Sequence, residues 1–178
     1  RPLALAAFAA DPLVDGDSLG SAVGFAAWGL MLIDALDEAH TALDRAIEEA
    51  TERGATIALA VARNLRAYVL YHRGDLAAAV DDAKRSLEIF EYGWSPSPWS
   101  APILIRSQLA LGDLEGARAT LAMAETGAVD RADRALMLEA RARVHLADGQ
   151  PAAALEDTRA VKEIVEHGLA ERSVRAFD

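Results

Sequence analysis

The chain repeats a segment of about 40 residues, and this internal repeat limits the folds that it can adopt. Two stretches of twenty residues, GDLAAAVDDAKRSLEIFEYG from Gly74 and GQPAAALEDTRAVKEIVEHG from Gly149, share an opening glycine, an AAA run, an aspartate, a Glu-Ile-x-Glu stretch and a closing glycine. A weaker copy begins at Gly112, and a fourth begins at Asp34 without the opening glycine. A period of roughly 34 to 45 residues is typical of a solenoid of helix-turn-helix units.

The residues of each copy predict a pair of antiparallel helices. The chain is rich in alanine and leucine and has little Val/Ile/Thr alternation, so it is predicted to be all-α. The opening glycine permits a positive φ at the end of one helix, and the aspartate that follows can cap the next helix. A small residue five positions after each start would let the two helices approach closely; these residues are Ala39, Ala79, Ala117 and Ala154.

The repeat predicts one domain of about four helix-turn-helix units. We expect repeats at residues 19–54, 55–93, 99–127 and 130–168, with first helices at 19–32, 56–73, 100–111 and 132–147 and further helical pieces at 3–10 and 169–177. Gly54, Gly93 and Gly168 are expected to end the second helices. The stretch EYGWSPSPWSAP, residues 91 to 102, is interpreted as the joint between the second and third units, because its prolines oppose helix continuation.

The G-D-L-x-x-A opening resembles the turn and second helix of a tetratricopeptide repeat. Ala27, Ala67 and Ala142 match the small position of that family's first helix, whereas Ile105 departs from it. The stretch ALDRAIEEATERGATIALAVARNLRAYVLYHRGDLAAAVDDAKRSLEI, followed by GW, resembles the helical-repeat region of large ATP-binding LuxR-family transcriptional regulators of the MalT-like group. This resemblance covers about residues 20 to 170 and implies an α-α superhelix of tetratricopeptide-like repeats.

The same resemblance implies a cytoplasmic switch protein with an N-terminal P-loop module, a repeat array that senses an inducer or partner, and a C-terminal DNA-binding helix-turn-helix. This segment has no G-x-x-x-x-G-K-[ST] motif, and too few residues follow Glu171 for a DNA-binding domain. Because the chain starts at Arg1, we expect it to be a fragment of a longer protein, and ATP binding and DNA binding to belong to the full-length protein only.

Composition argues against several classes of partner and cofactor. A formal net charge of -10 would repel a phosphate backbone, so this segment is not expected to bind nucleic acid directly. The longest apolar run, residues 21 to 33, is shorter than the roughly 18 to 20 residues that span a bilayer, so no membrane association is expected. The chain has no cysteine, its four histidines lack the spacing of metal ligands, and no cofactor is expected.

The stretch GDSLG around Ser18 fits the G-x-S-x-G pattern of a hydrolase nucleophile, but that motif needs a preceding buried strand and a supporting sheet. Capping of the next helix by Asp17 or Ser18 explains the same residues more simply. The calcium-loop pattern that begins at Asp15 fails as well, because Leu19 and Ala26 stand where oxygen ligands are needed. We therefore predict a protein that is not an enzyme, with an enzyme built on Ser18 as the minor alternative.

The candidate binding surface is the concave groove that the first helices would line. Counting back from each turn places there the residues Trp28 and Met31, Asn64, Tyr68 and Tyr71, Trp99 and Arg106, and Glu139 and Arg143. Aromatic rings supply contact area and guanidinium groups supply directional bonds. The alternative is that the rings pack between neighbouring helices; the polar tips of Asn64 and Tyr68 favour access to water, and the size of Trp28 favours burial.

We therefore predict a non-catalytic sensor or protein-interaction segment of a LuxR-type regulator, which binds an inducer or a partner protein in its groove. The alternative is a structural adapter for protein-protein interactions outside transcription. An exposed end of the array could also form a homo-oligomer.

Overall fold

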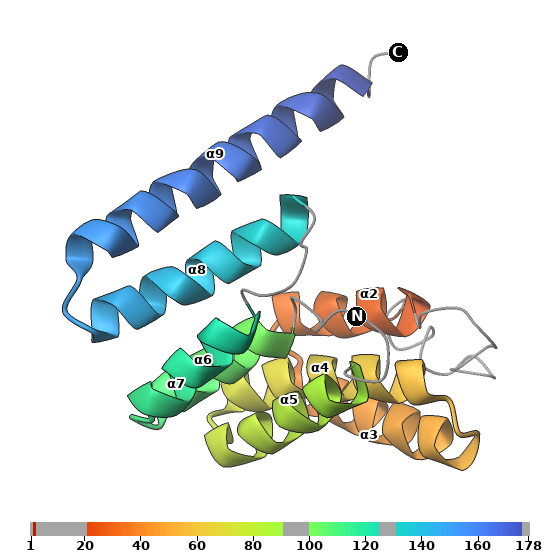
Figure 1. Ribbon diagram of the computed structural model, residues 1–178. Helices are drawn as coiled ribbons and strands as arrows, with labels where there is room; N and C mark the ends of the chain where they lie inside the picture. The colour runs from red at the N-terminus through yellow and green to blue at the C-terminus, as the bar shows by residue number, and fades with distance from the viewer. Residues whose placement is uncertain (1, 3–20, 91–99, 125–130, 176–178) are drawn as a thin grey trace.

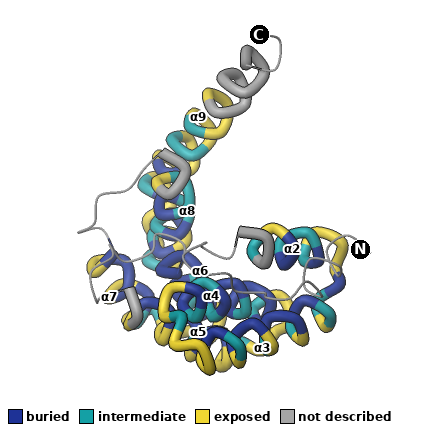
Figure 2. Tube along the Cα trace, turned by 90° about the vertical axis from the view of Figure 1, so that its right-hand side faces the viewer, coloured by how far each residue is buried: buried dark blue, intermediate teal, exposed yellow. Residues whose placement is uncertain are grey.

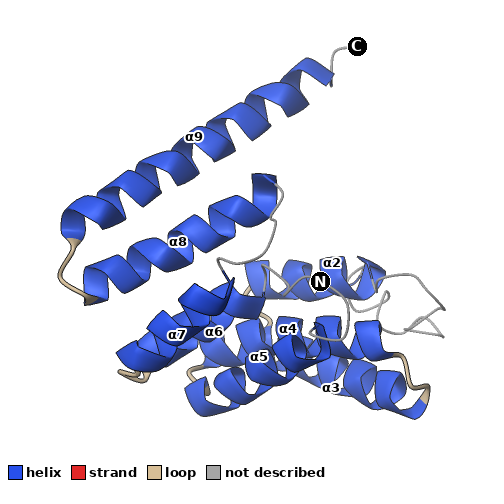
Figure 3. Ribbon diagram, in the orientation of Figure 1, coloured by secondary structure: helices blue, strands red, loops and turns tan. Residues whose placement is uncertain are grey.

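The computed structural model describes residues 2, 21–90, 100–124 and 131–175, and within these ranges every regular element is an α-helix (Figure 3). The prediction of an all-α chain is confirmed. The helices are α2 (Ser21–Leu32), α3 (Leu36–Glu52), α4 (Thr56–Arg73), α5 (Leu76–Phe90), α6 (Ser100–Ala110), α7 (Leu114–Ala124), α8 (Arg131–Ala147) and α9 (Pro151–Arg175).

Successive helices form four antiparallel hairpins, α2–α3, α4–α5, α6–α7 and α8–α9, which follow one another along the array (Figure 1). The first helices of neighbouring hairpins also contact each other: α2 packs on α4, α4 on α6 and α6 on α8. Residues on the outer side of α3 and α5 are exposed, and those that face neighbouring helices are buried (Figure 2). The first helices therefore form a continuous layer.

The turn inside each hairpin has the same backbone geometry. Gly74, Gly112 and Gly149 have φ of 85°, 79° and 71°, as the glycine pattern predicts. Asp34, which stands where the first copy lacks its glycine, has φ of 58° and is the non-glycine residue with positive φ in the described ranges. The turn thus keeps its left-handed conformation even without glycine. Aspartate adopts this conformation at a lower steric cost than most other non-glycine residues.

A hydrogen bond that closes each helix accompanies the left-handed residue. The amide of the residue after it donates to the carbonyl oxygen five residues earlier in the chain, the 6→1 bond of a Schellman motif. The four bonds join Ala35 to Leu30, Asp75 to Leu70, Asp113 to Gln108 and Gln150 to His145, at N···O distances of 2.8 to 2.9 Å. The expected aspartate cap is seen at Asp113, whose Oδ1 accepts from the Gly116 amide at 2.9 Å.

The glycines expected to end the second helices behave differently from one another. Gly54 has φ of 65° and follows α3, as predicted. Gly93 lies outside the described residues, as do 3–10 of the expected helical pieces. The prediction for Gly168 is wrong, because α9 continues through it to Arg175. A helix tolerates one glycine in its interior at a cost of about 1 kcal/mol.

Small residues line the contacts between helices. The alanine five positions after each turn is buried in all four hairpins, as predicted. Ala27, Ala67 and Ala142 in the first helices are buried too, and Ile105 fills the equivalent position of the third hairpin. Because these side chains are short, the helices can approach closely and gain dispersion contacts along their length.

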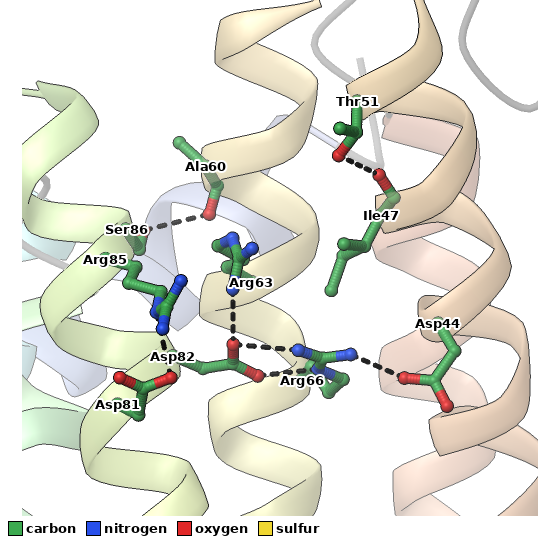
Figure 4. Close-up of polar contacts among 10 residues, drawn as sticks. All are labelled: Asp44, Ile47, Thr51, Ala60, Arg63, Arg66, Asp81, Asp82, Arg85 and Ser86. Carbon is green, nitrogen blue, oxygen red and sulfur yellow. Dashed lines mark hydrogen bonds and ion pairs between the residues drawn. The ribbon is translucent and has the colours of Figure 1, made fainter.

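In the second and fourth hairpins, an ion pair at the same position joins the first helix to the second. Asp82 on α5, 2% exposed, accepts from Arg66 Nε at 2.6 Å and from Arg63 Nη1 at 2.9 Å (Figure 4). The Nη1 of Arg66 also reaches Asp44 on α3 at 2.6 Å, so the network joins three helices. The hydrogen bond to Asp82 raises the pKa of the Arg66 guanidinium above its ordinary value.

The fourth hairpin repeats this pair with Arg141 and Asp157, at 2.6 Å and 2.9 Å, and with the same separation of 16 residues. In the first and third hairpins the equivalent positions hold Ala26 with Ala42 and Leu104 with Thr120. All four of these residues are buried. This pair of positions therefore holds a salt bridge in two hairpins and buried uncharged residues in the other two.

A pair of buried serines joins the second hairpin to the third. Ser86 on α5 donates to the carbonyl oxygen of Ala60 at 2.8 Å, and its Oγ lies 2.9 Å from the Oγ of Ser100, the first residue of α6. The two hydroxyl groups thereby fix the start of α6 against α5.

The turn conformation predicts opposite effects of two glycine-to-alanine substitutions. Gly112→Ala places a β-carbon on a residue with φ of 79°, where no neighbour lies within 4 Å, so the cost is purely conformational. We expect it to lower the free energy of unfolding by about 1 kcal/mol. Gly24→Ala in α2 meets only Leu65 at an ordinary contact distance of 3.9 Å and should raise the free energy of unfolding by about 0.5 kcal/mol. Urea unfolding measures both changes, and a stabilising Gly112→Ala would contradict the role of the turn.

The ion-pair position predicts that a double substitution is milder than a single one. Arg141→Leu leaves the buried Asp157 carboxylate without its guanidinium, so the free energy of unfolding should fall by about 2 to 3 kcal/mol. Arg141→Leu combined with Asp157→Thr introduces the residue pair of the third hairpin and removes the unpaired charge, so it should restore stability to within about 1 kcal/mol of the parent chain. Thermal and urea unfolding of the three proteins provide the comparison. If the double variant were as unstable as the single one, the two arrangements would not be interchangeable.

Candidate functional site

Four residues of the predicted groove occupy one equivalent position in the first helices. Trp28, Tyr68, Arg106 and Arg143 each lie six residues before the left-handed turn residue of their hairpin. Because α2, α4, α6 and α8 pack side by side, these four side chains form a row across the layer, which we call the inner row. Its first half is aromatic and its second half is cationic.

The aromatic half is a direct ring contact. The ring centroids of Trp28 and Tyr68 are 5.2 Å apart, with their planes inclined at 53°. Such tilted pairs contribute about 0.5 to 1.5 kcal/mol beyond the area that they bury. Trp28 is half-buried, and Met31 and Tyr71 pack against the same apolar cluster as the two rings.

The cationic half is organised by one carboxylate. Glu139 on α8 accepts from Arg106 Nη2 at 2.7 Å and from Arg106 Nε at 3.1 Å through Oε2. Its other oxygen, Oε1, accepts from Nε of Arg143, one helical turn further along α8. Two guanidinium groups therefore share one carboxylate, which leaves one positive charge at this end of the inner row.

The two halves meet at the Tyr68 hydroxyl. Burial raises the pKa of Tyr68 to about 12, the positive charge of Arg106 lowers it, and the negative charge of Glu139 raises it again. The Tyr68 hydroxyl is therefore within electrostatic range of both charged groups. The inner row is thus continuous from α2 to α8.

Asn64 lies one turn before Tyr68 on α4 and is buried, with 4% of its surface exposed. Among the residues that the structure describes, its Oδ1 has no hydrogen-bond partner. A buried carbonyl oxygen left unpaired costs about 1 to 3 kcal/mol, so such an atom is uncommon in a folded protein. The oxygen therefore has a capacity to accept a hydrogen bond that the described part of the chain does not use.

The structure brings together most of the residues predicted for the groove but buries some more deeply than expected. Asn64 and Tyr68 are both 4% exposed, so the expected access of their polar tips to water is wrong. Tyr71 is half-buried, and its ring lies edge-on to that of His72, with the ring centroids 5.6 Å apart. Trp99 lies outside the described residues, as do Ser18 and the joint around Trp94. The sharing of Glu139 by two arginines was not predicted, although its spacing of four residues from Arg143 was a signal.

A second polar surface, away from the inner row, has charged groups that pair within the chain. A shallow surface cavity of about 410 Å³ is lined by Asp34, Leu36, Asp37, Glu38, Arg73 and Asp75. Arg73 pairs there with Asp37 at 3.0 Å and with Asp75 at 3.2 Å. Among the described residues, no group of three or more His, Asp or Glu side chains is arranged to hold a metal ion.

Within the described ranges, none of the helices combines the length and the apolar character that crossing a bilayer requires.

The chain matches no protein-family model, and no curated protein matches it in sequence. The site therefore has to be interpreted from its own geometry.

The buried phenol predicts a late tyrosine ionisation. The pKa of Tyr68 is about 12 when folded against about 10 for an exposed tyrosine, so between these values the unfolded chain loses a proton that the folded chain keeps. The protonated Tyr68 phenol therefore contributes to the free energy of unfolding in full below pH 10. This contribution falls by about 1.4 kcal/mol per pH unit as the pH rises from 10 toward 12. Absorbance titration near 295 nm should show one late transition that Tyr68→Phe removes and Tyr71→Phe retains. A late transition that survived Tyr68→Phe would contradict the assignment.

Proposed function

We propose that this chain is a non-catalytic binding module that receives an inducer or a partner protein at its inner row. The observation that carries the proposal is the unpartnered, buried Oδ1 of Asn64 beside a row of two aromatic and two cationic side chains. A surface that only held helices together would gain from an apolar residue at position 64, because the cost of the unpaired oxygen would disappear.

We propose further that the four hairpins form a tetratricopeptide-like superhelix with the first helices on its concave side. The supports are the repeated turn geometry, the buried alanines at equivalent positions and the contacts between successive first helices. In such an array the inner row would run across the groove, so that one ligand could touch several repeats at once.

We place this module in the sensor region of a LuxR-type, MalT-like transcriptional regulator of the cytoplasm. The support is the sequence resemblance over about residues 20 to 170. In that setting ATP and DNA would be bound by other domains of the full-length protein, which agrees with the net charge of -10 on this segment. A complete reading frame without a P-loop module upstream and a helix-turn-helix downstream would remove this assignment and leave the binding module intact.

A structural adapter that holds partner proteins without sensing an inducer is the second candidate. The deep burial of Tyr68 favours it, because a side chain that is 4% exposed offers little surface to a small ligand. The two candidates differ in whether small molecules or only polypeptides bind.

Two matched arginines provide the test. Arg143 and Arg85 are similarly exposed, at 48% and 54% of their side-chain surfaces, and each pairs with a carboxylate four residues earlier on its helix. Arg143 belongs to the inner row, whereas Arg85 lies on α5, a second helix. Sugars, nucleotides, aromatic acids and short peptides would be screened against the chain by thermal shift.

We expect at least one compound or peptide whose stabilising shift is abolished by Arg143→Gln and retained by Arg85→Gln. Small-molecule binding supports the sensor, and binding of peptides alone supports the adapter. If no compound binds, or if both substitutions reduce the shift equally, the inner row is not a binding surface.

A further inference from the structure

We propose that the inner row and Asn64 together bind a small amphipathic monoanion that carries an aromatic group, an N–H donor and a carboxylate. This inference rests on the proposed function, because it assumes that the inner row is a binding surface. It names the ligand class from three features that lie on the first helices α2, α4, α6 and α8, which pack side by side.

The first feature is the aromatic end. Trp28 is half-buried and lies in tilted contact with Tyr68, while Met31 and Tyr71 are also half-buried beside them. A planar group placed on the accessible part of Trp28 would gain offset or edge contacts and polarisable neighbours. An aromatic ring satisfies this surface better than a polar group, which would lose its hydration there.

The second feature is the acceptor. Asn64 is on α4, one turn from Tyr68, and its Oδ1 lacks a partner. Among common small-molecule groups, an amide N–H donates one hydrogen bond and can lie next to an aromatic ring in the same molecule. A ligand without a donor would leave the oxygen unpaired, and sites built around a polar group reject such analogues strongly.

The third feature is the residual positive charge. Arg106 and Arg143 share the single carboxylate of Glu139. Within the described part of the chain, Arg143 donates to a protein acceptor through Nε and not through its two Nη groups. Its side chain is 48% exposed. One further carboxylate would neutralise the site and could be held by two parallel N–H groups. A cation would compete with two arginines for Glu139 and is disfavoured.

The order of the features gives the orientation of the ligand. The aromatic residues come from α2 and α4, the acceptor from α4, and the arginines from α6 and α8. The ring would therefore lie toward α2, the N–H at α4 and the carboxylate toward α8. A molecule with ring, amide and carboxylate in this sequence is an N-aroyl amino acid.

N-benzoylglycine is the probe that tests this class, because each of its three features can be removed separately. N-acetylglycine lacks the ring, N-benzoyl-N-methylglycine lacks the N–H, and N-benzoylglycinamide lacks the negative charge. Isothermal titration of the chain with N-benzoylglycine should give saturable binding to one site. Each of the three analogues should bind at least tenfold more weakly.

Two substitutions connect these losses to the named residues. Asn64→Leu removes the acceptor while keeping the branching and the number of side-chain heavy atoms, and Arg143→Gln removes an exposed charge; each should weaken N-benzoylglycine at least tenfold. Arg85→Gln should leave the dissociation constant unchanged. Asn64→Leu should also make the N-methyl analogue no worse than the parent probe, which a general loss of packing would not do. If Asn64→Leu fails to fold, the N-methyl analogue still measures the same hydrogen bond on the unmodified chain.

The outcomes separate this inference from the proposed function. Equal binding of the neutral or N-methylated analogue, or no effect of Arg143→Gln on N-benzoylglycine, would overturn the ligand class. If N-benzoylglycine does not bind but another screened compound or peptide loses its thermal shift in Arg143→Gln, the ligand class is wrong and the binding module stands. If nothing binds in a manner sensitive to Arg143→Gln, both proposals fail.

Discussion

The left-handed residue at the end of each first helix is the constraint on which the rest of the structure depends. It closes the helix with a 6→1 hydrogen bond and turns the chain back at a fixed point. Every position in the hairpin is then set by its distance from that residue. Trp28, Tyr68, Arg106 and Arg143 form a row because each is six residues from such a turn, and not because the four residues resemble one another.

Between the turns, the array is held together by closely packed small residues and by a few buried polar links. Alanines occupy the helix contacts, so each contact is short but contributes little apolar area. The Arg66–Asp82 network and the Ser86–Ser100 pair add direction to these contacts, since hydrogen bonds hold only in one geometry. Alanine contacts therefore bring the helices together, and polar links specify how they are aligned.

The sequence was most informative where a residue type has a single physical use. Glycine at 74, 112 and 149 and alanine at 39, 79, 117 and 154 predicted the turns and the close contacts correctly, because positive φ and short side chains are local requirements. The same residue type was a poor guide at Gly168, where α9 continues to Arg175, because a helix interior also accepts a glycine at a cost of about 1 kcal/mol.

The sequence was least informative where burial depends on several helices at once. The polar tips of Asn64 and Tyr68 suggested access to water, but both residues are buried, and Tyr68 packs in one cluster with residues of α5 and α6. Likewise, the separation of 16 residues between Arg66 and Asp82 has no meaning on one helix and becomes a contact only when α4 and α5 fold back on each other. Tertiary packing decides both features.

The alternation of charged and uncharged pairs along the array has a consequence for how the chain avoids misfolding. Repeats that resemble one another can exchange partners during folding, so that a first helix docks on the second helix of the wrong hairpin. If α4 docked on α7, Arg66 would meet Thr120 in place of Asp82, and Asp82 would be left without a guanidinium. If α2 docked on α5, Asp82 would face Ala26. An exchange between the second or fourth hairpin and a neighbouring hairpin would thus leave a buried carboxylate without its guanidinium, which disfavours the misfolded pairing.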